Sequence, residues 1–229
     1  MQILDQSEED QEIVFRLWQA LLSFCHVCKT GRRDATTTVN ETDSPWYVDK
    51  LADILKRARS WMRASSAPVQ LVSMKAFALG VEALFSFQNQ LLPILHQCWP
   101  ALIGVLKNGA FIAKAASCRA IVAAVNNSGS FYSKRFQEEA LPLVLQLLNE
   151  LASCSANATV PYLQGPRFAL QSELLSGLAD VCKCLELPED QVKSCVASCQ
   201  AYFDKAQPKR LRELAESAVS KMKSFVREK

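Results

Sequence analysis

Apolar residues recur every three or four positions along most of the chain, which is the spacing of one face of an α-helix. The clearest case is segment 209–226, where charged residues fill the positions between the apolar ones. Its apolar members are Leu211, Leu214, Ala215, Ala218, Val219, Met222, Phe225 and Val226. Segments 13–28, 48–62 and 192–203 carry the same stripe. The pattern therefore predicts amphipathic helices through most of the sequence.

Two middle segments, 91–106 and 110–125, are apolar nearly all round. A helix without a polar face is covered on more than one side, so we expect these two in the middle of a helical array. No segment favours a strand, because the Thr-rich residues 36–39 lie within a polar loop at 31–45. Seven glycines in 229 residues also disfavour hairpin-rich sheets and phosphate-binding loops. The predicted fold class is all-α.

The predicted helix starts form two interleaved sets. One set is Pro68, Ala110, Pro166 and Pro208, and the other lies near Val48, Gln90, Ser133 and Glu189. Apart from an insert at 155–165, each set repeats about every 42 residues, and a two-helix unit of this length is typical of HEAT repeats. We therefore expect an α-solenoid of HEAT-type helix pairs. Residues 1–45 would form an N-terminal helix and polar linker, and residues 46–229 four HEAT-like pairs.

A stack of helix pairs buries one continuous core and leaves a long surface without an enclosed pocket. Such a surface typically binds protein partners. The net charge of +3 is too small to indicate nucleic acid or an anionic membrane. The acidic first ten residues do not resemble a signal peptide, and Lys114 and Arg119 interrupt the most apolar stretch. We expect no membrane partner and a cytoplasmic location, with the nucleus as a second one.

The nine cysteines are predicted to be free thiols. Three pairs lie close in sequence: Cys25 and Cys28, Cys182 and Cys184, and Cys195 and Cys199. Zinc would need two such pairs brought together, but most of these cysteines fall on apolar stripes, where they act as small hydrophobic residues. The two histidines, His26 and His96, lack a catalytic motif around them. We expect no metal, no cofactor and no enzymatic activity.

The basic residues Lys209, Arg210 and Arg212 open the last predicted helix. The terminal helix of a solenoid has one side without a neighbouring repeat, and loops often carry function. We expect a protein partner to bind near these three residues and the insert, with Trp46 or Tyr162 as aromatic anchors. A merely solvated face is the alternative. Nucleic acid is disfavoured because no aromatic residues are interleaved with the basic ones.

Two resemblances follow from particular residues. Pro100, Asn108 and Lys114 have the spacing of the proline, acidic and basic positions of a HEAT repeat, with Asn108 in place of the usual Asp. More specifically, the string NQLLP at residues 89–93, followed by His96, Gln97, Trp99 and Pro100, resembles the Tel-two-interacting protein one family. Supporting positions are Arg135, Phe136, Leu141, Pro142, Gln207, Pro208, Leu211 and Ala215.

That family provides the HEAT-repeat scaffold of the Triple-T (TTT) complex, and the resemblance covers roughly residues 68–225 of this chain. Family members are several-fold longer, and this chain resembles their C-terminal end. The resemblance implies binding to Tel-two and Tti-two subunits. Through them it implies a role in the maturation and stability of PIK-related kinases (TOR, ATM and ATR) with the heat-shock chaperone machinery. The alternative is a HEAT-repeat transport or nucleic-acid-associated adaptor that shares only the solenoid.

Overall fold

The computed structural model describes residues 8–31 and 45–227, and the regular elements in these ranges are all helical. The chain divides into two compact units, Met1–Leu102 (unit 1) and Ile103–Lys229 (unit 2), which are described separately. Unit 1 holds α1 (Glu8–Gly31), α2 (Tyr47–Trp61), α3 (Ala67–Ala83) and most of α4 (Gln88–Asn108). The predicted all-α class is confirmed. The polar loop predicted at 31–45 lies almost wholly outside the described residues.

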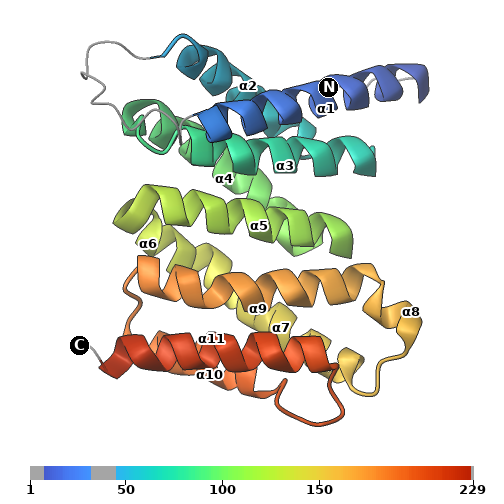
Figure 1. The fold of residues 1–229 in the computed structure, drawn as a ribbon, viewed down its shortest axis with the longest axis vertical. Helices are drawn as coiled ribbons and strands as arrows, with labels where there is room; N and C mark the ends of the chain where they lie inside the picture. The colour runs from blue at the N-terminus through green and yellow to red at the C-terminus, as the bar shows by residue number, and fades with distance from the viewer. Residues whose placement is uncertain (1–7, 32–44, 228–229) are drawn as a thin grey trace. The chain divides into compact units, whose positions relative to one another are not determined.

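Unit 1 consists of two layers of helices. α1 lies along α3, and α2 and α4 form the other layer (Figure 1). An ion pair between Lys29 of α1 and Glu82 of α3 joins the first two helices. In the second layer, Nε2 of Gln90 in α4 donates to Oδ1 of Asp49 in α2 over 3.2 Å. Trp18 on the inner face of α1 is almost completely buried, so packing of an apolar face holds α1 in this unit.

Unit 2 also consists of two rows of helices. Its helices are α5 (Phe111–Ser128), α6 (Ser133–Arg135), α7 (Leu141–Ser155), α8 (Val160–Leu163), α9 (Pro166–Cys184), α10 (Glu189–Gln200) and α11 (Lys209–Arg227). A 3₁₀ turn, η1 (Gly129–Tyr132), precedes α6, and a π-helix, η2 (Phe136–Ala140), joins α6 to α7. α5, α9 and α11 form one row, while α7 and α10 form the other (Figure 1). Ion pairs between Arg119 and Glu173 and between Lys221 and Asp180 join successive helices of the first row.

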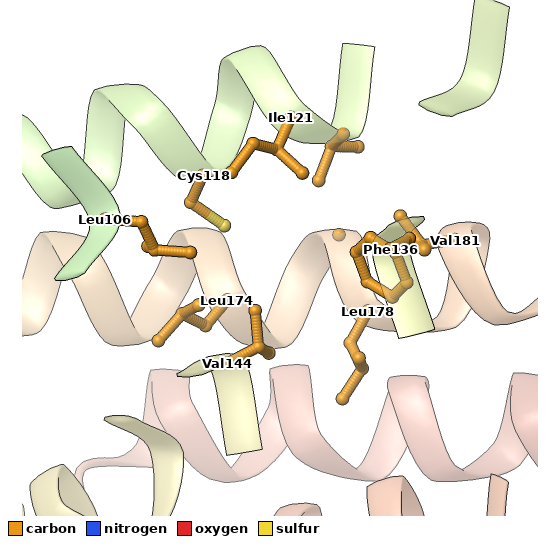
Figure 2. Close-up of a pocket in the computed structure, with 10 residues that line it drawn as sticks. Leu106, Cys118, Ile121, Phe136, Val144, Leu174, Leu178 and Val181 are labelled. Atoms are coloured by element: carbon orange, nitrogen blue, oxygen red, sulfur yellow. The ribbon is translucent and has the colours of Figure 1, made fainter. Parts of the chain in front are cut away.

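The core of unit 2 is closely packed. Figure 2 shows apolar side chains such as Leu106, Cys118, Phe136 and Leu174 converging on a cavity of only about 20 Å³. That volume is close to the least that one water molecule requires. A Cβ on Gly177 of α9 would lie 2.7 Å from Cγ2 of Val122 in α5, so the absence of a side chain lets these two helices approach each other.

The helices begin close to the predicted starts. Eight of them begin at Tyr47, Ala67, Gln88, Phe111, Ser133, Pro166, Glu189 and Lys209. The insert at 155–165 is not wholly irregular, because it contains the single helical turn α8. The π-helix is a further feature that the sequence pattern did not predict. Lys114, the basic residue of the HEAT-like spacing, donates from Nζ to the carbonyl of Lys107 over 2.9 Å and so caps the end of α4.

Candidate binding surface

A surface hollow in unit 2 brings the insert and the start of α11 together. Nine residues line it: Asn157, Ala158, Leu163, Phe168, Ala206, Gln207, Pro208, Lys209 and Arg210. We call it the α11 hollow, and its volume is about 330 Å³. Its two charged lining residues, Lys209 and Arg210, are both basic and exposed. Leu163 and Phe168 add apolar surface, so the hollow combines positive charge with an apolar wall.

The loop before α11 is held by its own hydrogen bonds. Oδ1 of Asp204 accepts from the backbone N–H of Ala206 over 2.8 Å, an arrangement typical of a turn built on an aspartate side chain. The backbone N–H of Arg212 donates to the carbonyl of Pro208 over 3.1 Å and closes the first turn of α11. Lys209 and Arg210 therefore begin α11 directly after an ordered turn.

The insert is attached to the same loop through Asn157. This residue has φ of 57°, in the left-handed region that Asn tolerates better than most residues. Its backbone N–H donates to the carbonyl of Ala206 over 2.7 Å. The left-handed turn thus directs the insert against the loop that precedes α11, and the two walls of the α11 hollow are joined directly.

A buried network of polar side chains underlies the hollow. Oγ of Ser155 donates to Oε1 of Gln207 over 2.5 Å, and Nε2 of Gln207 donates to the carbonyl of Ala152 over 2.7 Å. Nε2 of Gln171 in α9 donates to Oγ of Ser155 and to the carbonyl of Leu151, each over 2.9 Å. Buried polar groups need such partners, so these contacts fix the positions of the loop, α9 and the end of α7.

Two tyrosines complete this network. The hydroxyl of Tyr202 donates to the carbonyl of Leu148 over 2.8 Å, and that of Tyr162 donates to Oε1 of Gln171, also over 2.8 Å. Burial raises the pKa of both phenols, most strongly that of Tyr202. Both tyrosines therefore remain protonated hydrogen-bond donors at neutral pH.

The structure places the five predicted binding residues in different surroundings. Lys209 and Arg210 line the hollow, and Nζ of Lys209 lies 3.8 Å from Oε1 of Glu213. Arg212 is half-buried and is not among the lining residues. Tyr162 is half-buried, and its hydroxyl supports the polar network. Trp46 belongs to unit 1, and 78% of its surface is exposed.

Sequence reasoning did not assign a structural role to Gln171, Gln207 and Ser155. All three are buried. Gln171 carries the one signal that was available, because it follows Leu170 and precedes Leu174 on the buried face of α9. A polar residue at a core position indicates a buried hydrogen-bond network.

The cysteines are placed mainly inside the two units. All nine are free thiols, and seven of them are buried. Burial is the largest cause that raises the pKa of Cys25 and of Cys118 to about 12 in each case. A hydrogen bond from Cys182 lowers the pKa of Cys195. The described parts of the chain contain no group of three or more His, Cys, Asp or Glu side chains arranged to hold a metal ion.

The α11 hollow has the chemistry of a binding surface for a protein segment. Its basic residues suit acidic side chains, while Leu163 and Phe168 suit an apolar side chain from the same segment.

None of the helices over 8–31 and 45–227 is both long enough and apolar enough to cross a membrane.

Comparison with known proteins identifies relatives of the chain. It is 28% identical over 177 residues to the mouse protein named "TELO2-interacting protein 1 homolog" and 29% identical over 177 residues to the human protein of that name. Each match covers 77% of this chain but only 16% of the relative. No solved structure matches the chain. The family model described as "TTI1 C-terminal TPR domain" matches residues 8–226, and the chain therefore belongs to that family.

Proposed function

We propose that the chain is a non-catalytic protein-interaction scaffold that binds a TELO2-like subunit through the α11 hollow. The observation that carries this proposal is the family match over residues 8–226, together with relatives whose name describes TELO2 binding. The chain spans about a sixth of the length of these relatives, so it would supply one part of a larger scaffold.

The hollow is the surface best suited to this role. Lys209 and Arg210 are exposed at its rim, where positive charge accelerates the approach of an acidic partner. The apolar wall of Leu163 and Phe168 can receive a side chain that is buried on binding, which supplies most of the affinity in typical interfaces. The buried network beneath it holds the surface in one shape, which reduces the entropy lost on binding.

The family resemblance suggests the wider assembly. The scaffold would join subunits similar to Tel-two and Tti-two in a TTT-like complex. It would act indirectly on PIK-related kinases such as TOR, ATM and ATR, together with the heat-shock chaperone machinery. With this role we expect the protein in the cytoplasm, with the nucleus as a second location.

Charge reversal at the start of α11 tests the proposed surface. The variant carries Lys209→Glu, Arg210→Glu and Arg212→Glu together, and the control carries Lys56→Glu, Arg57→Glu and Arg59→Glu on the exposed side of α2. Pull-down of Tel-two-like and Tti-two-like subunits at low and high salt measures the effect. We expect the α11 variant to lose recovery of the Tel-two-like (TELO2-like) subunit, and the control to retain it.

The salt dependence gives a second readout. Wild-type binding should weaken as salt rises, because salt screens exposed charges, and the α11 variant should lose most of that dependence. Unchanged recovery of both subunits by the α11 variant, with helical content intact by circular dichroism, would contradict the proposal.

A further inference from the structure

Helix α1 carries a second apolar face besides the one buried in unit 1. This face consists of Ile13, Leu17, Ala20, Phe24 and Val27, which we call the α1 stripe. The steps between these residues alternate between four and three, so they lie within an arc of about 80° on an ideal helix. Ile13, Leu17 and Val27 are 61%, 56% and 64% exposed. The contacts of α1 within unit 1 leave this face largely uncovered.

The neighbouring helix α2 has a matching edge. Tyr47, Ile54 and Trp61 recur every seven residues, and all three are half-buried. Asp49, which accepts a hydrogen bond from Gln90 of α4, lies about 140° around the helix from them. These three residues, which we call the α2 edge, therefore lie on the side of α2 away from α4.

Aromatic rings connect the two apolar surfaces. The ring of Trp46 lies 6.3 Å from that of Phe24 in the α1 stripe and 6.3 Å from that of Tyr47 in the α2 edge. Trp46 itself is 78% exposed. The α1 stripe and the α2 edge thus meet at a cluster of three aromatic residues.

An array of stacked helix pairs is soluble when its terminal repeat has a polar outer face. Single exposed apolar residues are common on any protein, but the α1 stripe has four exposed residues and the half-buried Phe24 along one helical seam, so they are not scattered. We propose that the α1 stripe and the α2 edge are a docking face for a further amphipathic helix pair, which would continue both layers of unit 1.

Two observations favour a helical occupant of this face. The alternation of four and three along α1 is the spacing at which a second helix packs along a first. In addition, the matched region covers only 16% of each relative, and the family model describes it as a C-terminal domain, so these relatives have much more sequence before it. A lipid surface fits poorly, because Arg16 beside the stripe is neutralised by Glu12 at 2.7 Å rather than available to anionic lipids.

Binding in trans tests this inference with the full chain. The probe is the human relative from which the region matched by this chain has been deleted. The chain carries Leu17→Glu in one variant and, as a matched control, Gln19→Glu, which adds the same charge at an exposed polar position of α1. We expect the wild type and the control to bind the probe equally, and Leu17→Glu to bind about tenfold more weakly or worse.

Two further variants distinguish loss of the docking face from misfolding of the chain. Ile13→Glu and Trp46→Ala change other exposed residues of the same face, and both should weaken binding while the circular dichroism spectrum stays unchanged. Trp46 should also show a blue-shifted fluorescence contribution when the probe covers it, and this contribution should be lost in Trp46→Ala.

Several outcomes would overturn the inference. These are absence of binding between the wild type and a folded probe, or equal binding by Leu17→Glu and Gln19→Glu. A concentration-dependent dimer that Leu17→Glu abolishes would instead assign the face to a second copy of this chain. The face lies in unit 1, so these results do not depend on whether the α11 hollow in unit 2 binds a TELO2-like subunit.

Discussion

Gln171 donates from Nε2 to the carbonyl of Leu151, 2.9 Å away in the last turns of α7. The same amide group bonds Oγ of Ser155, and its Oε1 accepts from the hydroxyl of Tyr162. One buried side chain of α9 therefore positions the end of α7 and the one-turn helix of the insert. Because both elements lead into the α11 hollow, the shape of this surface depends on a residue that lies beneath it.

Replacement of Gln171 by leucine, which is similar in size, should destabilise the protein by about 1–3 kcal/mol. It removes the acceptor of the Tyr162 hydroxyl and one donor each to the carbonyl of Leu151 and Oγ of Ser155. Urea unfolding followed by circular dichroism measures this change. Gln146→Leu is the control, since Gln146 is exposed and should alter the free energy of unfolding by less than about 0.5 kcal/mol. Equal midpoints for the two variants would contradict a structural role for the network.

Gly177→Ala should destabilise unit 2 by about 1–3 kcal/mol, because the new Cβ would lie 2.7 Å from Cγ2 of Val122. Val122 is β-branched and has little rotamer freedom in a helix, so α5 and α9 would have to separate. Gly104→Ala is the matched control, because its Cβ would meet nothing within 4 Å and alanine favours a helix by about 1 kcal/mol. Thermal unfolding should show a lower midpoint temperature for Gly177→Ala and a higher one for Gly104→Ala, each compared with the wild type.

The sequence predicted the helices better than the α11 hollow. Helix starts depend on local signals, such as the proline at the beginning of α9 and the apolar period of α11. These signals can be recognised in the sequence without knowledge of the fold. The repeat length of about 42 residues is nearer to HEAT than to the 34 residues of a TPR unit, although the family carries the TPR name. Both names describe stacked helix pairs.

The α11 hollow could be predicted only in part. Lys209 and Arg210 were recognised from their charge, and the insert from its composition. The contact between Asn157 and Ala206 joins residues 49 positions apart through a left-handed turn, and no periodic pattern encodes it. The α1 stripe was missed because its residues merged with the buried stripe of the same helix, and only solvent exposure separates the two.

Cys154 should react first with a thiol reagent at pH 8, because it is the exposed cysteine, whereas seven others are buried. A pKa raised to about 12 leaves Cys118 with only about one thiolate in ten thousand molecules at that pH. Ellman's reagent should therefore show one fast thiol in the native protein and all nine after denaturation. Cys154→Ser should remove the fast phase, and its persistence would show that a buried thiol becomes accessible.

Asn157 should tolerate glycine but not valine. Its φ of 57° is open to glycine without strain, whereas a β-branched residue there is expected to cost about 1–2 kcal/mol. Asn157→Val should also loosen the bond to the carbonyl of Ala206 and so alter the α11 hollow, while Asn157→Gly should retain it. Hydrogen exchange at the backbone amide of residue 157, expressed relative to the intrinsic rate of each amide, measures this directly. We expect less protection in Asn157→Val than in Asn157→Gly. Equal exchange in both variants would mean that the left-handed turn does not hold the insert against the loop before α11.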